Sequence, residues 1–259
     1  MKRQSGPAAQ GTLLKDGEKL ETLSPRCSVI TGSGYTFTTD TILLAAFSLP
    51  HPGENCADFG TGCGTIPLFW CDRSAPRRVY AVELQESACT LARRSAALNG
   101  LEDRIEIVQK DIRALKEERA LPFGLDRIAC NPPYYPDGAG PHSGKEERRL
   151  ARHETACSFA EIAAAAAAFL RWGGYFCCCL KPERLCTAMV TLHSAGLEPK
   201  RLRLVQQRTD KAPFLFLLQA SRGGRPGLTA EPALLLEAPD GSCSEEIRKI
   251  YGDYRGKRK

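Results

Sequence analysis

Short apolar runs alternate with longer amphipathic segments along most of the chain. The apolar runs are bounded by glycine, proline, asparagine or aspartate, which is typical of buried strands. They predict seven strands, over residues 56–59, 78–82, 105–108, 126–130, 175–180, 202–205 and 214–219. The segments between them predict helices over residues 41–49, 65–71, 85–99, 112–119, 158–172 and 182–195.

The order of these elements predicts an α/β fold. Strands that alternate with helices at this spacing form a parallel sheet with helices on both faces. The last two strands follow each other without a long helix between them, so they predict an antiparallel hairpin at the end of the sheet. We therefore expect one domain over residues 21–250, a flexible N-terminal segment over 1–20 and a basic tail over 251–259.

Composition narrows the class of protein. The chain of 259 residues is 42% hydrophobic and 25% charged, an ordinary balance for a globular protein. No secretory signal is visible behind Lys2 and Arg3, and the alanine-rich run near residues 162–170 is too short to span a membrane. We expect a cytoplasmic protein without membrane contact. The 12 cysteines lack C-x-x-C spacing, so we expect reduced thiols and no metal.

The net charge of +6 is unevenly placed along the chain. Six basic residues and one acidic residue fall within positions 248–259, and further basic clusters lie in 145–153 and 200–211. Local basic patches suit a polyanionic partner. A solvated face with a solubilising tail would give the same pattern, and the oligomeric state stays open between a monomer and a weak homodimer.

Candidate chemistry begins at the end of the first sheet strand, because ligands of parallel α/β sheets bind beyond the carboxyl ends of the strands. Asp58 is followed there by a turn containing Gly60, Gly62 and Gly64, where the backbone can pass close beneath a ligand. The spacing is not G-x-G-x-x-G, and no G-K-[ST] follows. The spacing therefore argues against a dinucleotide pyrophosphate site and against a P-loop. A turn with a purely structural role would show the same three glycines, so that alternative stays open.

Acidic residues end the next two strands. Glu83 can accept hydrogen bonds from both hydroxyls of a ribose. Asp111 can accept from the exocyclic amine of an adenine with Ile112 against the ring, but alone it would equally suit a helix N-cap. A glycine turn and two acids on consecutive strand ends indicate an adenosyl group without a pyrophosphate, which points to S-adenosylmethionine.

The fourth strand ends at Asn131-Pro132-Pro133-Tyr134. The two prolines remove two backbone donors, so nearby carbonyl groups remain free to accept hydrogen bonds. Asn131 offers an amide oxygen, and Tyr134 offers a flat surface on which a base can stack. A proline-stopped strand end would explain the prolines but not the flanking residues.

These strand ends together resemble the amino-methyltransferases of the Rossmann-like S-adenosylmethionine class. Within that class the chain is similar to the bacterial tRNA1(Val) adenine-37 N6-methyltransferase family. That similarity rests on residues 35–45, 131–135, 151–154 and 244–251, and it covers nearly the whole chain. The tetrapeptide also occurs in glutamine N5-methyltransferases and in DNA and rRNA adenine methyltransferases, so those substrates stay open.

The resemblance implies methylation of N6 of an adenine in tRNA, with S-adenosylmethionine as cofactor and no metal. It assigns catalysis to Asn131, Pro132, Pro133 and Tyr134, and it adds Thr38, Asp40 and Asn131 to the cofactor site. It places RNA against Tyr134, Tyr135, Arg152, His153, Arg255, Lys257 and Arg258. Two other classes stay open: a protein-glutamine methyltransferase, and a non-catalytic RNA-binding protein that retains a cofactor fold.

Overall fold

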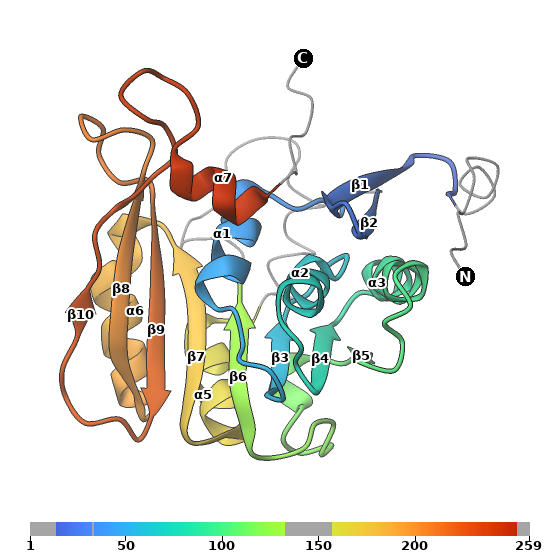
Figure 1. Cartoon of the computed structure of the whole chain (residues 1–259). Helices are drawn as coiled ribbons and strands as arrows, with labels where there is room; N and C mark the ends of the chain where they lie inside the picture. Colours follow the sequence, from blue (N-terminus) through green and yellow to red (C-terminus); the bar gives the residue numbers. More distant parts are fainter. Residues whose placement is uncertain (1–13, 33, 133–156, 253–259) are drawn as a thin grey trace, which may run out of the picture.

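A twisted β-sheet runs through the centre of the molecule in a computed structural model, which describes residues 14–32, 34–132 and 157–252 (Figure 1). Seven strands form its body in the order β8-β9-β7-β6-β3-β4-β5. Their bounds are β3 Asn55–Phe59, β4 Arg78–Glu83, β5 Ile105–Gln109, β6 Leu125–Cys130, β7 Leu170–Leu180, β8 Leu197–Gln206 and β9 Leu215–Arg222. β9 is antiparallel to both of its neighbours, while β3 to β7 pair in parallel. The predicted fold class is therefore confirmed.

Two additional strands of two residues each, β10 (Thr229–Ala230) and β11 (Leu234–Leu235), pair in parallel with β8. They extend the sheet beyond the seven strands that the sequence predicts. They carry too few residues to give a periodic signal.

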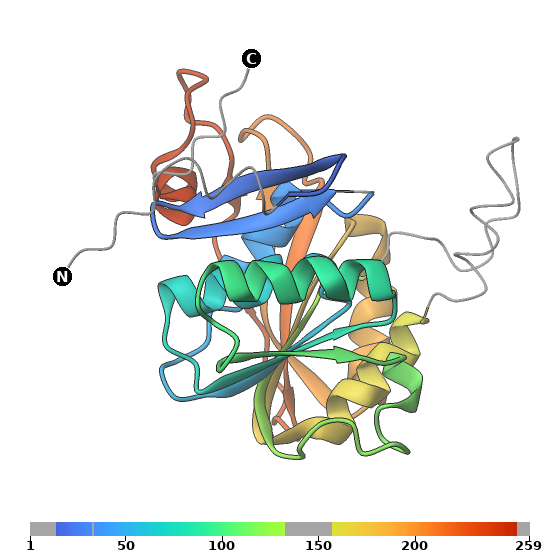
Figure 2. The same ribbon diagram turned by 90° about the vertical axis from the view of Figure 1, so that its right-hand side faces the viewer.

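Helices cover both faces of the sheet, and each face has its own hydrophobic core. One face is covered by α1 (Thr39–Phe47), α2 (Thr65–Arg73) and α3 (Glu86–Leu98). The other is covered by α5 (Phe159–Phe169) and α6 (Leu185–Ser194). In the side view of Figure 2 the sheet lies between α3 (blue-green) and α5 (yellow).

Fully buried aromatic and aliphatic side chains fill these cores. Trp70 is 0% exposed, and its indole Nε1 donates to the Ala45 carbonyl at 3.1 Å, which ties α2 to α1. The indole N–H therefore has a partner in an otherwise apolar setting. Phe169 and Phe176 occupy the opposite core beneath α5. No helix in the described ranges is long and apolar enough to cross a membrane.

Nine of the 12 cysteines are buried, and all 12 are free thiols. Cys177 and Cys179 face the core beneath α1 to α3, whereas Cys178 faces the core beneath α5 and α6. All three are 0% exposed, so they act there as small apolar side chains. No group of metal-ligating side chains occurs among the described residues.

An antiparallel hairpin of β1 (Glu18–Ser24) and β2 (Cys27–Gly32) lies against α3 and was not predicted. Its backbone is held by side chains of the helix. Ile30 N donates to Ser95 Oγ at 2.9 Å, and the amide of Asn99 bonds both backbone groups of Ser28. β1 begins at Glu18, within the segment 1–20 for which we expected flexibility.

Two predicted helices are shorter than expected. The helix over 112–119 is reduced to the 3₁₀ turn η2 (Ile112–Ala114), which is followed by turns up to Arg119, where φ is 50° and no longer helical. The helix over 158–172 ends at Phe169, since Leu170 already pairs with β6 as the first residue of β7. The segment 182–195 starts with the 3₁₀ turn η3 (Pro182–Arg184) before α6.

A short terminal helix, α7 (Glu245–Tyr251), was not predicted as a helix. Ser244 caps it by accepting from Ile247 N at 3.2 Å, and the Ile247 side chain is buried. Arg203 on β8 forms a bidentate ion pair with Glu246, at 2.6 and 2.7 Å. The helix is thus held by the ion pair to β8 and by Ile247, Ile250 and Tyr251, which pack against the core.

Candidate active site

The carboxyl ends of β3, β4 and β6 lie side by side at the upper edge of the sheet in Figure 1. Phe59, the last residue of β3, pairs with Val82 on one side and with Cys130 on the other. The strand order reverses between β3 and β6, which is where open α/β sheets bind ligands. The structure thus brings together the glycine turn, Glu83 and Asn131, as the sequence predicts.

The glycine turn requires glycine at each of its three positions. Gly60, Gly62 and Gly64 have φ angles of 75°, 57° and 87°, a region that other residues rarely adopt. A Cβ atom on Gly64 would also lie 3.3 Å from the Cβ atom of Ala92 on α3. The turn is held against β4, because the backbone N–H groups of Gly60 and Thr61 both donate to the Val82 carbonyl.

The carboxylate of Glu83 binds the backbone of the glycine turn as well as facing the candidate active site. Its Oε2 accepts from Gly62 N at 3.0 Å, and its Oε1 accepts from Leu84 N at 2.8 Å and Gln85 N at 2.9 Å. Sequence reasoning predicted the acceptor role toward a ribose but missed these three backbone contacts. A carboxylate has about four lone-pair sites, so it can still accept from a ligand.

Asp58 is a buried carboxyl group without a partner. Its side chain is 1% exposed, and neither oxygen has a hydrogen-bond partner among the described residues; the same holds for the Thr61 hydroxyl. Burial raises the pKa of Asp58 to about 7; the neighbouring Thr61 hydroxyl, although outside hydrogen-bond geometry, lowers it, and the charge of Glu83 raises it by less than burial does. An orphaned buried carboxyl is costly, so the site fits a ligand that brings a charged donor.

Asp111 is engaged by its own chain. Its Oδ1 accepts from Arg113 N at 2.9 Å and caps η2, and its Oδ2 accepts from the Arg113 guanidinium at 2.6 Å. This guanidinium holds the pKa of Asp111 below its usual range. The structure therefore shows the N-cap role, and the adenine contact of Asp111 and Ile112 stays a prediction.

Asn131 and Pro132 follow β6, and the side chain of Asn131 is tied to two other elements. Its Nδ2 donates to Thr41 Oγ1 at 3.2 Å, and its Oδ1 accepts from the Cys179 thiol at 3.2 Å. Sequence reasoning missed both partners. Because Thr41 lies in the first turn of α1, this contact also brings the predicted residues Thr38 and Asp40 to the same edge of the sheet.

The remaining predicted site residues lie outside the described part of the chain. They are Pro133, Tyr134, Tyr135, Arg152, His153, Arg255, Lys257 and Arg258. Their roles stay predictions.

The basic cluster over residues 200–211 is largely neutralised within the fold. Arg201 pairs with Glu231 at 2.7 Å, and Arg208 pairs with Asp210 at 3.2 Å. Arg203 pairs with Glu246, as described above. Most of this cluster is therefore satisfied by acidic residues, some of them far away in the sequence.

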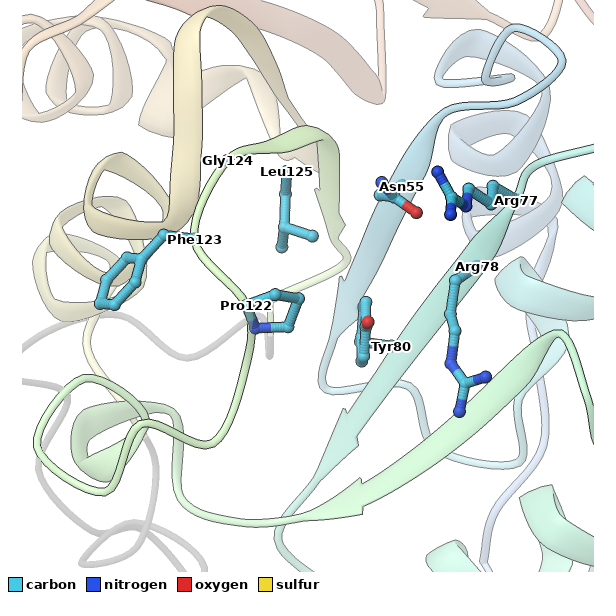
Figure 3. A pocket seen from close by; sticks show the side chains of 8 residues that line it. All are labelled: Asn55, Arg77, Arg78, Tyr80, Pro122, Phe123, Gly124 and Leu125. Carbon is cyan, nitrogen blue, oxygen red and sulfur yellow. The ribbon is translucent and has the colours of Figure 1, made fainter.

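A cavity of about 480 Å³ lies at the opposite end of the sheet (Figure 3). It is bounded by the first residues of β3, β4 and β6 and by the loop before β6. Its lining is Asn55, Arg77, Arg78, Tyr80, Pro122, Phe123, Gly124 and Leu125. Since the candidate site lies at the carboxyl ends of the same strands, this cavity is not part of it.

A parallel sheet with this strand order, a glycine turn and a buried acid at the switch point defines a Rossmann-like methyltransferase fold. Residues 38–181 match the model of the methyltransferase small domain family. The chain belongs to that family and, within it, to the tRNA1(Val) (adenine(37)-N6)-methyltransferases. It is an S-adenosylmethionine-dependent methyltransferase.

Relatives named tRNA1(Val) (adenine(37)-N6)-methyltransferase occur in distant bacteria. The protein of Bacteroides thetaiotaomicron is 30% identical over 220 residues, covering 83% of this chain and 88% of its own. That of Escherichia coli O157:H7 is 28% identical over 239 residues, covering 86% and 95%. That of Shewanella sp. strain MR-4 is 27% identical over 225 residues, covering 85% and 92%.

Solved structures support the fold. A predicted O-methyltransferase from Agrobacterium tumefaciens has a TM-score of 0.67 at 22% identity, covering 82% of this chain and 95% of its own. TrmN from Thermus thermophilus has a TM-score of 0.50 at 24% identity, covering 70% and 48%. At these identities the likeness concerns the fold alone.

Proposed function

We propose that the protein methylates N6 of an adenine in tRNA, and that this adenine is position 37 of tRNA1(Val). The observation that carries the proposal is the Asn131 amide, placed directly after β6, the strand next to the glycine turn and the orphaned carboxyl of Asp58. The names of the relatives supply the substrate. We place this reaction in the cytoplasm.

The residues at the ends of β3 and β4 fit the cofactor. Asp58 would receive the ammonium group of its methionine part, because that group supplies the charged donor that the buried carboxyl lacks. Glu83 would accept from the ribose hydroxyls, above a turn whose glycines leave room for a ligand. When bound, S-adenosylmethionine supplies an electrophilic methyl group on a sulfonium centre.

The end of β6 would hold the amine that is methylated. The lone pair of an adenine N6 is delocalised into the ring, so this nitrogen is a poor nucleophile. Asn131 Oδ1 and the Pro132 carbonyl can accept its two hydrogens and draw the nitrogen toward tetrahedral geometry. No strong base is required before attack, because the proton becomes acidic only after the methyl group is attached. Catalysis then consists of preorganised acceptors and alignment.

Residues outside the described part of the chain complete this proposal. Tyr134 would stack on the adenine, which must leave the stacked anticodon arm before its N6 can be reached. Arg152 and His153 would lie near phosphate. These roles rest on the resemblance of the sequence.

The proposal is tested on tRNA from a strain that lacks the gene. Mass spectrometry of its nucleosides should show loss of N6-methyladenosine, and the purified protein should restore the methyl group to that tRNA. Transfer to a release-factor protein instead of tRNA would favour the glutamine methyltransferase. Cofactor binding without transfer to either substrate would favour the non-catalytic alternative.

Removing the basic tail should weaken tRNA binding without affecting the cofactor. The cut belongs after Gly252, because α7 extends to Tyr251 and packs against the core. We expect a higher KM for tRNA and a shallower salt dependence, since each lost phosphate contact reduces the slope by roughly 0.7 to 0.9. Titrations of tRNA and of S-adenosylmethionine at several salt concentrations measure these effects.

A second variant separates charge from chain length. Replacing Arg255, Lys257, Arg258 and Lys259 by glutamine keeps the tail but removes its charge. It should behave like the truncated protein. Unchanged KM and salt slope in both variants would show that the tail only solubilises the protein.

The cofactor affinity should depend on pH through Asp58. With its pKa raised to about 7, this carboxyl group is protonated in slightly acidic solution, whereas a cationic ammonium group binds the ionised form. We expect the Kd for S-adenosylmethionine to rise as pH falls below 7, by roughly tenfold per pH unit at most. Calorimetry in buffers of different ionisation enthalpy should show proton release on binding in that range.

The folding stability of the cofactor-free protein should depend on pH through the same group. In the unfolded chain an aspartate titrates near pH 4, so between about pH 4 and 7 the folded state binds the additional proton. Because the folded state binds more protons than the unfolded state in this window, the free energy of unfolding of the cofactor-free protein should decrease as pH rises from about 4 to 7. Asp58→Asn should remove both dependences; identical pH profiles in the two proteins would contradict the assignment.

A further inference from the structure

The amide of Asn131 is held from two sides by residues outside its own strand. Thr41 Oγ1 accepts from its Nδ2 at 3.2 Å, and the Cys179 thiol donates to its Oδ1 at 3.2 Å. Thr41 belongs to α1, and Cys179 lies on β7, the strand next to β6, where it is 0% exposed. The amide is thus clamped between a helix and the neighbouring strand.

The chemistry of the two partners selects one orientation of the amide. The S–H group of Cys179 is a weak donor and its sulfur is a weak acceptor, and the amide oxygen is the atom that this S–H group reaches. A flipped amide would lose the donation from Cys179 and place N–H groups against the sulfur. On the other side, Thr41 Oγ1 already accepts from Thr38 N at 3.5 Å, as part of the N-terminal cap of α1.

We infer that Thr41 and Cys179 are positioning residues that fix the Asn131 amide before the substrate amine arrives; this rests on the proposed function. An amide oxygen has two lone pairs, and Cys179 occupies one of them. The other remains for an N–H group of the substrate. Because the amide nitrogen is bound to Thr41, the side chain cannot swing away from that position without breaking a hydrogen bond.

The strand β7 offers a matched control. Cys177 faces the same core as Cys179 and is equally buried, but its thiol donates to Gln219 Oε1 at 3.9 Å and not to Asn131. Replacing either cysteine by alanine removes one buried thiol from the same core, but at Cys177 the neighbouring polar groups are Gln219 and Arg127, not Asn131. A difference between the two variants therefore reports the contact with Asn131.

The first test needs no substrate. The chain contains three asparagines, Asn55, Asn99 and Asn131, so protein labelled with ¹⁵N at asparagine gives three side-chain amide pairs in an NMR spectrum. Asn131→Ala identifies the third pair by its loss. Cys179→Ala and Thr41→Val should each shift this pair and leave the other two in place, whereas Cys177→Ala should move none of them. An unmoved Asn131 pair in both variants would overturn the inference.

The second test measures single-turnover methylation of tRNA at saturating cofactor. We expect Cys179→Ala to lower the rate constant about tenfold with an unchanged Kd for S-adenosylmethionine, because misplacing a catalytic group slows the step it serves. Cys179→Ser should recover part of the rate, since a hydroxyl also donates. Cys177→Ala should match the wild type.

A double substitution separates positioning from a general loss of stability. In an Asn131→Ala background, Cys179→Ala should cause no further loss of rate, because it acts through the residue already removed. A full additional loss there would overturn the inference. A wild-type protein that methylates no tRNA would instead overturn the proposed function, and the NMR comparison would still decide whether Cys179 orients the amide.

Discussion

Replacing Asn131 by alanine should lower turnover by about a hundredfold or more and leave the affinity for S-adenosylmethionine nearly intact. The substitution removes a preorganised acceptor for the substrate amine, and loss of one such group costs about 10²–10³ in rate in well-studied enzymes. Its amide oxygen and nitrogen are bound to Cys179 and Thr41, not to the glycine turn that would hold the cofactor. Single-turnover rates and calorimetry measure the two effects separately.

Asn55→Ala is the matched control for this experiment. Asn55 begins β3 and lines the cavity at the opposite end of the sheet (Figure 3). Its loss should leave both the rate and the cofactor affinity unchanged. If both Asn131→Ala and Asn55→Ala retain the wild-type single-turnover rate, the side-chain amide of Asn131 takes no part in methyl transfer.

Glu83→Ala should raise the Kd for S-adenosylmethionine by about 10- to 150-fold, which corresponds to roughly 1.4–3 kcal/mol. The carboxylate acts twice: it accepts from the backbone N–H groups of Gly62, Leu84 and Gln85, and it would accept from the ribose. Glu83→Gln, which keeps one acceptor oxygen, should lie between the wild type and the alanine variant. Calorimetry of cofactor binding measures the series.

Glu86 supplies the comparison for Glu83. It stands three residues later, in the first turn of α3, where its carboxylate pairs with Arg93 at 3.3 Å on the exposed surface. Glu86→Ala removes the same charge without touching the glycine turn and should leave the affinity unchanged. Equal affinities in the Glu83→Ala and Glu86→Ala proteins would remove Glu83 from the cofactor site.

Much of the sheet could be predicted from the sequence, because its strands are short apolar runs ended by breakers. Cys130 is followed by Asn131 and two prolines, and Phe59 by a glycine turn, so both strand ends are visible in the residue pattern. The hairpin β1–β2 could not be predicted in this way. It is held by Ser95 of α3 and by Asn99, which follows that helix, and contacts across that sequence distance leave no periodic signal.

The candidate site likewise has residues that the sequence could predict and residues that it could not. Residues that end adjacent strands were predicted, since parallel strands place their carboxyl ends at one edge. The partners of Asn131 were not, because Thr41 and Cys179 lie 90 and 48 residues away from it. The sequence could not show how the basic cluster over 200–211 is paired for a similar reason: Glu231 and Glu246, which neutralise two of its arginines, belong to later segments.

The burial of nine cysteines also decides where this protein can react. The thiolate is the nucleophilic form, and burial raises the pKa of Cys27 to about 12 and that of Cys89 to about 11. Oxidants and alkylating agents therefore cannot reach most of the cysteines, and we expect them to react at Cys186 and Cys243, the two exposed thiols. A cysteine-rich composition thus coexists with low chemical reactivity for as long as the fold is intact.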